Sequence, residues 1–177
     1  MPAGRLCSRT RDRSTTHAAV CRGALLEETR VRTIMEALEP REFPRDAGKK
    51  PTMVRVLVVD DEPLIRWSVA ETLTERGCVV VQTGDGSGAR SAVQEADAFD
   101  VVLLDYRLPD SDDLSLLASI RHAVPRAQVI VMTAFGRPEV VRSALDLGAY
   151  CVIGKPFEMQ TIAELVAEAA ASTREIH

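Results

Sequence analysis

Four short apolar runs in this chain are each followed, or ended, by a residue that can contact phosphate or metal. The runs are Val56 to Val59, Val101 to Leu104, Val129 to Met132 and Tyr150 to Ile153. Apolar runs of this length, separated by stretches with helical periodicity, are typical of strands buried on both faces of a parallel sheet. All strands of such a sheet point the same way. Groups just past their ends therefore converge on one edge, where open α/β folds bind ligands.

The residues at these strand ends form one chemical set, namely Asp60 and Asp61, then Asp105, Thr133 and Lys155. Two carboxylates about 4 Å apart repel each other by roughly 4 kcal/mol at an effective dielectric constant of about 20, so three require a cation or a raised pKa. An all-oxygen site with room for water suits Mg²⁺. A divalent ion beside a hydroxyl and an ammonium suits a phosphoryl group, because phosphoryl transfer depends mainly on positioning and charge stabilisation.

Lys155 is the single lysine among the eleven basic residues from Met53 onward. The chain otherwise uses arginine, yet it places a compact ammonium at the strand end where a point charge would reach a phosphoryl oxygen. An ordinary surface lysine is the alternative interpretation. Pro156 follows, so the Lys155–Pro156 bond is a candidate for the cis isomer, although most X-Pro bonds are trans.

Four segments together resemble the receiver domain of bacterial two-component response regulators, of the CheY-like superfamily. They are VLVVDDE (56–62), DVVLLDYRLPD (100–110), VIVMTA (129–134) and GKPFE (154–158), and IRW (65–67) is similar to the nitrogen-regulation branch. The resemblance covers residues 53–171. It implies a single doubly wound α/β fold, flavodoxin-like, with a five-stranded parallel sheet in the order 2-1-3-4-5 flanked by five helices.

The resemblance also implies what the strand-end residues do. Asp105 is expected to take a phosphoryl group from the phosphohistidine of a histidine kinase or a phosphotransfer protein, forming an acyl phosphate. Thr133 is expected to turn toward the phosphoryl oxygen, and Lys155 to pair with it. No turnover of an external substrate is expected.

The same resemblance implies a set of Mg²⁺ ligands. Asp61 is expected to bind the ion directly and Asp60 through water. Asp105 and the backbone carbonyl of Arg107 complete the set, and Glu62 is a candidate contributor from further out. A carboxylate is a weak nucleophile that a metal ion and an ammonium can position, which agrees with this assignment.

The chain departs from the family pattern in two places. Where many receivers carry Tyr or Phe in the last strand, this chain has Val152. Tyr150 precedes it by two residues and is therefore expected on the same strand face, as a substitute switch residue or, more simply, in a packing role. Eight residues after the phosphoacceptor, where the family usually has Gly, the chain has Asp113, which with Asp112 could cap the next helix.

Periodicity predicts five helices, at residues 64–76, 89–96, 114–123, 139–147 and 159–171. Pro138 suits the first turn of the fourth helix, and Gly77 and Gly148 are expected to stop the first and the fourth. The segment TGDGSG (83–88) follows the second strand. It lacks the complete GxGxxG fingerprint and its acidic partner, so we expect a plain loop there and not a phosphate cradle.

Composition fits a regulator made of one domain and an extension. The chain has 177 residues, 46% of them hydrophobic, which is enough to fill a core. No apolar run approaches the roughly 20 residues that cross a bilayer, and no signal core follows the N-terminus. A cytoplasmic protein without membrane contact is expected. Cys78 and Cys151 are interpreted as small buried hydrophobes.

Charge divides the chain into two parts. Residues 1–52 carry eleven basic and seven acidic residues, a net charge of +4. Residues 53–177 carry a net charge of −8, and the two sum to the −4 of the whole chain. The acidic domain at 53–171 is not expected to bind nucleic acid directly, and 172–177 are expected to form a short tail. For 1–52, with disorder expected to about Cys21, three interpretations stay open. They are an extension upstream of a natural start at Met53, a flexible tail, and a partner-binding helix or targeting peptide.

Few residues follow the last predicted helix, so the output is expected to be contact with a downstream protein. In the resembling family the usual surface is formed by the fourth helix, the fifth strand and the fifth helix, here near Val140, Val141, Leu145 and Val152. Two other functions stay open. An aspartyl-phosphate phosphatase of the haloacid type needs a second Asp where Arg107 stands, and a scaffold would keep the fold without phosphorylation.

Overall fold

The computed structural model describes residues 19–21, 53–95, 99–111, 114–134 and 136–174. In this part of the chain six strands form one sheet in the order β1-β6-β5-β4-β2-β3. The strands are β1 (Ala19–Cys21), β2 (Arg55–Val59), β3 (Val79–Thr83), β4 (Val101–Asp105), β5 (Gln128–Thr133) and β6 (Cys151–Gly154). Strands β2 to β6 pair in parallel. Counted from β2, their order is 2-1-3-4-5, which confirms the predicted fold.

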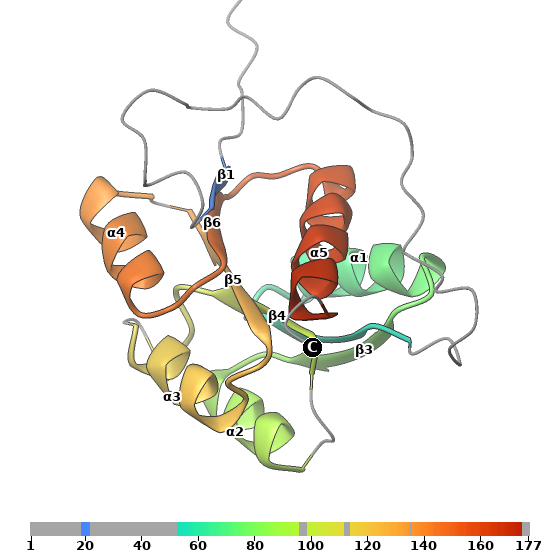
Figure 1. Cartoon of the computed structure of the whole chain (residues 1–177), viewed down its shortest axis with the longest axis horizontal. Coiled ribbons are helices and arrows are strands. Elements are labelled where there is room, and N and C mark those ends of the chain that lie inside the picture. The colour runs from blue at the N-terminus through green and yellow to red at the C-terminus, as the bar shows by residue number, and fades with distance from the viewer. Residues whose placement is uncertain (1–18, 22–52, 96–98, 112–113, 135, 175–177) are drawn as a thin grey trace, which may run out of the picture.

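Five helices cover the two faces of the sheet (Figure 1). They are α1 (Pro63–Glu75), α2 (Gly86–Glu95), α3 (Ser115–Ala123), α4 (Pro138–Asp146) and α5 (Met159–Arg174). One apolar cluster joins alternate strand residues to α1 and α5, and the other joins the intervening residues to α2, α3 and α4. Strand β4 lies at the centre and is buried along its whole length. This two-sided burial explains why its sequence is an unbroken apolar run up to Asp105.

A short strand near the N-terminus was not predicted. Ala19–Cys21 form β1, which pairs antiparallel with β6, so the sheet is not purely parallel and the disorder expected up to Cys21 does not extend over these three residues. The pairing gives the edge of β6 hydrogen-bonding partners that an open sheet edge lacks. A three-residue strand is too short to produce a detectable pattern in the sequence. The other residues of 1–52 lie outside the described part of the chain.

The predicted helix boundaries agree with the structure to within three residues. Pro138 is the first residue of α4, and Gly77 and Gly148, which follow α1 and α4, have φ angles of 84° and 96°. Only glycine adopts these angles readily, which explains both helix ends. Helix α5 continues to Arg174, so the predicted tail at 172 begins inside the helix. Asp112 and Asp113, expected to cap α3, lie outside the described residues.

Two local predictions were wrong. The TGDGSG segment is not a plain loop, because α2 begins within it at Gly86. Tyr150 does not share a sheet face with Val152, since Tyr150 packs against the cluster under α1 and α5 while Val152 belongs to the opposite cluster. Strand alternation fails here because β6 begins only at Cys151. Tyr150 therefore has a packing role on the other side of the sheet.

Cys78 and Cys151 are both buried, as predicted. Burial raises the pKa of the Cys78 thiol to about 11, and the nearby Asp100 carboxylate adds to the shift. No helix among the described residues is both long and apolar enough to cross a bilayer.

Candidate functional site

The parallel strands bring the predicted strand-end residues to one edge of the sheet. Asp60 directly follows β2, Asp105 ends β4, Thr133 ends β5, and Lys155 directly follows β6. These four strands are consecutive neighbours in the sheet. The backbone N–H of Lys155 donates to the carbonyl of Thr133 at 2.7 Å, so the last two strand ends are joined directly. The Lys155–Pro156 bond is cis.

The Lys155 ammonium is the centre of the site. Its Nζ lies 2.6 Å from Asp105 Oδ2, 2.8 Å from Asp60 Oδ2 and 3.3 Å from Glu62 Oε1. The side chains of Asp60, Asp105 and Lys155 are 0%, 7% and 9% exposed, whereas that of Glu62 is 59% exposed. The short contacts are therefore the buried ones, where solvent screens them least.

Burial and charge act against each other on these groups. Burial raises the pKa of Asp60, with a smaller contribution from Asp105, and the hydrogen bond and charge of Lys155 only partly oppose it. Burial alone would lower the pKa of Lys155, but hydrogen bonds and charge attraction from Asp105 and Asp60 raise it above its ordinary value. Lys155 is thus a fixed positive charge at neutral pH, held among three acidic side chains.

Backbone groups orient the two buried carboxylates. Asp60 Oδ1 accepts a hydrogen bond from the N–H of Glu62 at 2.9 Å, and Asp105 Oδ1 accepts one from the N–H of Arg107 at 3.1 Å. Arg66 on α1 donates from Nη1 to the carbonyl of Asp60 at 2.5 Å. Sequence reasoning did not identify Arg66 as part of the site. Its position in the first turn of the helix that follows Asp60 and Glu62 is the signal that was available.

One predicted ligand lies apart from the cluster. Oxygen atoms of Asp60, Glu62 and Asp105 lie within 4.8 Å of one another, while Asp61 is exposed and outside this group. Thr133 is buried at the end of β5, with a relative exposure of 2%. The structure therefore brings Asp60, Asp105 and Glu62 into contact with Lys155, and it places Thr133 at the end of the neighbouring strand.

The site fits a hard cation such as Mg²⁺. All of its acidic donors are carboxylate oxygens, the ligand type that Mg²⁺ prefers. Asp60 Oδ2 is buried and lies 2.8 Å from the Lys155 ammonium, and the structure gives it no second polar contact among the described residues. A buried oxygen in that state has coordination capacity left. Asp60, Glu62 and Asp105 therefore form an acidic pocket that could bind a metal ion.

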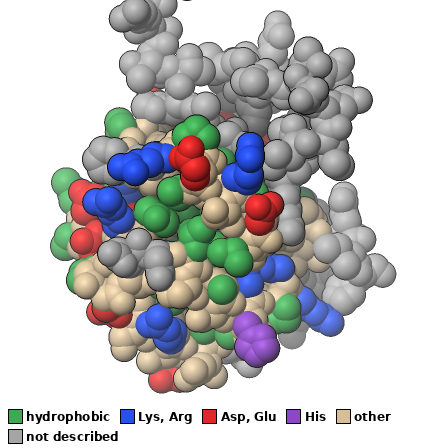
Figure 2. Space-filling view, turned by 90° about the vertical axis from the view of Figure 1, so that its left-hand side faces the viewer, with side chains coloured by type: hydrophobic (Ala, Val, Ile, Leu, Met, Phe, Trp, Pro, Cys, Tyr) green, Lys and Arg blue, Asp and Glu red, His purple; other side chains and the backbone are tan. Residues whose placement is uncertain are grey.

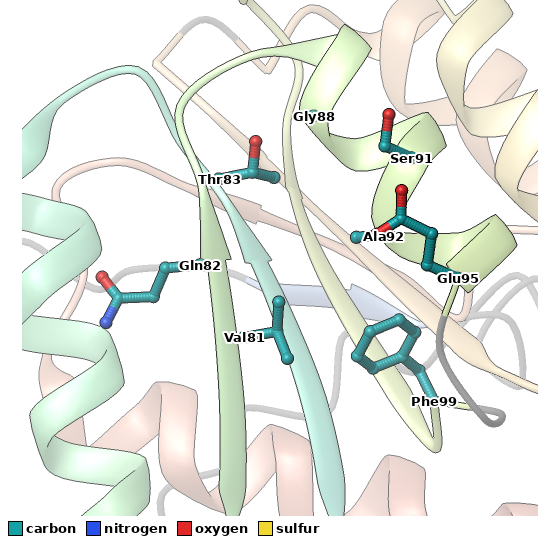
Figure 3. A pocket seen from close by; sticks show the side chains of 8 residues that line it. All are labelled: Val81, Gln82, Thr83, Gly88, Ser91, Ala92, Glu95 and Phe99. Carbon is teal, nitrogen blue, oxygen red and sulfur yellow. The ribbon is translucent and has the colours of Figure 1, made fainter.

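A separate pocket lies between β3 and α2 and has a volume of about 350 Å³. Its lining includes Val81, Phe99, Thr83 and Glu95, and none of the acidic cluster residues. Figure 3 shows the Val81 and Phe99 side chains on the α2 side of the sheet, while Gln82 points away. The pocket therefore lies beside the edge strand, apart from the carboxylates.

Comparison with known proteins agrees with this geometry. The family model described as response regulator receiver domain matches residues 56–167. The transcriptional regulatory protein PdtaR of Mycobacterium tuberculosis is 36% identical over 126 residues, covering 69% of this chain and 59% of PdtaR. The chemotaxis protein CheY of Treponema pallidum is 34% identical over 125 residues, covering 68% of this chain and 87% of CheY.

A solved structure supports the fold alone. The CheY-like receiver domain protein from Methanospirillum hungatei has a TM-score of 0.68 at 24% sequence identity, over 71% of this chain and all of that one. The matched part of this chain spans only 59% of the length of PdtaR. On the family match over residues 56–167, together with the sheet order and the acidic pocket, the chain belongs to the response regulator receiver domain family.

Proposed function

We propose that this chain accepts a phosphoryl group on Asp105, with Mg²⁺, from the phosphohistidine of a histidine kinase or a histidine phosphotransfer protein. The observation that carries the proposal is the cluster in which the Lys155 ammonium contacts Asp105 and Asp60 at 2.6 and 2.8 Å. A cytoplasmic location, where such donors present their phosphohistidine, belongs to the same proposal. The acidic charge of residues 53–177, a net of −8, gives no support to direct nucleic-acid binding.

The chain's own groups position the nucleophile. Asp105 uses Oδ2 for Lys155 and Oδ1 for the N–H of Arg107, so its carboxylate plane is fixed at both oxygens. A carboxylate oxygen attacks phosphorus, a P–O bond forms, and the P–N bond to the donor imidazole breaks with its electron pair going to that imidazole. Bound Mg²⁺ would neutralise charge on the transferred oxygens. Lys155 remains as a positive partner for the new phosphoryl group.

The contacts of Lys155 favour one of two proposed placements of the ion. Lys155 already contacts all three carboxylates of the cluster. A divalent ion about 4 Å from this ammonium would be repelled by roughly 8 kcal/mol at an effective dielectric constant of about 20. We therefore propose that Asp105 would hold Mg²⁺ together with groups other than those that Lys155 already contacts. Asp61 and the Arg107 carbonyl are its proposed direct partners, with Asp60 acting through water.

Signalling is proposed to use the surface of α4, β6 and α5. Phosphorylation adds about −1.5 to −2 charge at Asp105, and Thr133 and Lys155 would be drawn toward it, which biases a two-state arrangement of this surface. Figure 2 faces the side of the molecule that carries α2, α3 and α4 and shows hydrophobic side chains at its centre among charged ones, so it includes only the α4 part of the proposed surface. An apolar centre with a charged rim suits contact with another protein.

The competing phosphatase function has less support. A haloacid-type enzyme needs an acid two residues after the nucleophile, and that position holds Arg107. Asp110, the next acidic residue along the chain, is exposed, and its carboxylate accepts hydrogen bonds from Gly86 and Ser87. The Asp110 carboxylate is therefore bound to the start of α2 and not directed at Asp105 as a second catalytic acid. A scaffold without phosphorylation would have no use for the Lys155 cluster, which costs desolvation energy to maintain.

Incubation with acetyl phosphate and Mg²⁺, followed by intact-protein mass spectrometry, tests the proposal. We expect one added phosphoryl group in the wild-type chain and none in Asp105→Asn. The matched control is Asp146→Asn, at the exposed C-terminal end of α4, which should behave as wild type. Steady release of many equivalents of phosphate would favour the phosphatase. No modification of the wild-type chain would favour the scaffold.

A further inference from the structure

The loop that follows Asp105 is folded into a compact turn. Leu108 and Ser111 form an isolated antiparallel bridge, with N–H···O distances of 2.8 and 3.2 Å in the two directions. Leu108 is buried in the core cluster beneath α2, α3 and α4, which anchors the turn from below. Asp110 stands between the two bridge residues, at the exposed tip of the turn.

The Asp110 carboxylate ties this turn to the start of α2. Oδ1 accepts a hydrogen bond from the N–H of Gly86 at 2.7 Å, and Oδ2 accepts one from the N–H of Ser87 at 2.8 Å. The first amides of a helix have no partner within the helix and carry its positive partial charge. The hydrogen bond from Gly86 lowers the pKa of Asp110, with further contributions from Ser87 and Arg90. Two backbone amides of TGDGSG, those of Gly86 and Ser87, thus bind the Asp110 carboxylate.

Close approach at Gly86 shows how tightly the two segments fit. A Cβ added at Gly86 would lie 3.1 Å from Asp110 Oδ1 and 3.1 Å from Leu116 Cδ2. Both distances are shorter than ordinary van der Waals contact. The absence of a side chain at this position therefore lets the carboxylate reach the helix N-terminus.

These contacts hold the segment from Asp105 to Asp110 at both ends. At one end the N–H of Arg107 donates to Asp105 Oδ1 at 3.1 Å. At the other end Asp110 is bound to α2, 24 residues away in the chain. The carbonyl of Arg107, a proposed Mg²⁺ ligand, lies in the held segment. The Arg107 residue is exposed, so burial does not fix its backbone. The contacts at Asp105 and Asp110 do.

We propose that Asp110 is a positioning residue for the metal site: by clasping the N-terminus of α2, it fixes the loop that presents the Arg107 carbonyl beside Asp105. This inference rests on the proposed function, because it assumes that the loop carbonyl binds Mg²⁺. It assigns Asp110 no contact with the phosphoryl group.

Asp110→Ala is compared with a matched variant at the same helix end. Asp85 caps α2 by accepting a hydrogen bond from the N–H of Gly88 at 2.6 Å, a contact with the first turn of that helix and not with the β4–α3 loop. Both alanine variants remove a carboxylate from the start of α2, and each should lower the urea midpoint by a similar amount. Asp110→Ala should weaken Mg²⁺ binding by about tenfold, as loss of a group that orients a ligand does. Asp85→Ala should leave it within about twofold.

Two further variants separate positioning from general destabilisation. Asp110→Asn keeps an oxygen acceptor without the charge and should give a Mg²⁺ affinity between those of wild type and Asp110→Ala. Gly86→Ala perturbs the same clasp from the helix side and should weaken Mg²⁺ binding in the same direction. These variants also carry the test if Asp110→Ala does not fold.

The measurements are calorimetric titration with Mg²⁺ and ¹H–¹⁵N spectra of the full chain without phosphoryl donor. In Asp110→Ala the amide signals of Arg107 and Leu108 should shift or broaden, and in Asp85→Ala they should not. At saturating Mg²⁺, Asp110→Ala should be phosphorylated by acetyl phosphate at close to the wild-type rate. Equal Mg²⁺ affinities for Asp110→Ala and Asp85→Ala would overturn the positioning role. Failure of the wild-type chain to bind Mg²⁺ or to be phosphorylated would overturn the proposed function itself.

Discussion

Lys155 Nζ lies 2.6 Å from Asp105 Oδ2, although the two residues are 50 positions apart in the chain. The same ammonium is 2.8 Å from Asp60 Oδ2. One cation thus balances two buried carboxylates that burial alone would leave strongly destabilised.

Replacing Lys155 by Met should lower the free energy of unfolding by about 3 kcal/mol at about pH 7, because it leaves two buried carboxylates without an opposite charge. In the folded wild-type chain the pKa of Lys155 is raised above its ordinary value of 10.5. The contribution of Lys155 to stability is therefore complete at neutral pH, and it is lost only as the pH rises through the folded-state pKa. Urea denaturation at several pH values measures the effect.

The pH dependence of the Lys155→Met defect provides the internal check. The pKa of Asp60 is already raised above 3.8 by burial, and loss of Lys155 should raise it further. The defect should therefore shrink as the pH falls toward about 5, where Asp60 can take up a proton. A defect that stays constant between these pH values would show that lost packing, and not unbalanced charge, is responsible.

Asp61 and Glu62 should contribute differently to Mg²⁺ binding. Glu62 is mostly exposed and makes the longest of the three contacts with Lys155, at 3.3 Å, so we expect Glu62→Gln to change the Mg²⁺ dissociation constant by less than about threefold. Asp61→Asn should raise it by more than about tenfold, since it removes a charged direct ligand. Calorimetric titration of the two variants measures both. A larger loss of Mg²⁺ affinity in Glu62→Gln than in Asp61→Asn would instead place the ion in the Asp60–Glu62–Asp105 cluster.

Thr133→Ala should separate phosphorylation from signalling. The hydroxyl is proposed to respond to the phosphoryl group, while nucleophilic attack depends on Asp105. We expect the variant to accept phosphate from acetyl phosphate, but its amide shift changes in α4, β6 and α5 on adding beryllofluoride and Mg²⁺ should fall by about half or more. Thr72→Ala is the control, because the Thr72 hydroxyl donates to the carbonyl of Ser68 within α1. A full response in Thr133→Ala would remove Thr133 from the switch.

Gly77 and Gly148 should differ in their tolerance of alanine. Both have positive φ, which costs a residue with a Cβ about 1 kcal/mol or more. An added Cβ at Gly77 meets no atom within 4 Å, but at Gly148 it would lie 3.1 Å from Arg121 Nε. Arg121 is itself held by a hydrogen bond to the carbonyl of Ala127 at 2.5 Å. Gly148→Ala should therefore lower the urea midpoint more than Gly77→Ala, and equal midpoints would contradict this reading of the Arg121 contact.

The helices and central strands were predictable because their signals are local. The runs ending at Asp105 and Thr133 are apolar without interruption, since both faces of β4 and β5 are covered by helices. Gly77 and Gly148 marked helix ends for a reason that each residue carries in its own backbone. The five-strand order came with the resemblance to receiver domains, and the sheet confirms it.

Two of the features that were missed, β1 and the role of Asp110, depend on contacts between distant segments. Strand β1 exists through pairing with β6, more than a hundred residues later. Asp110 reaches back to the start of α2, and Tyr150 packs on the face opposite to the one that strand alternation predicted. Periodicity describes which residues are buried, but it carries no information about which distant group lies beside them.

The amino-acid sequence by itself determined that a parallel sheet would form and that Asp60, Asp105, Thr133 and Lys155 would stand at its carboxyl edge, because burial patterns and strand direction are encoded locally. Only the tertiary structure decided that Lys155 pairs with Asp60, Glu62 and Asp105, that Asp61 stays exposed, and that Asp110 binds the amides of α2. Ion pairs and hydrogen bonds act over a few ångströms in space, so which groups meet is settled by how the helices and loops pack around the sheet.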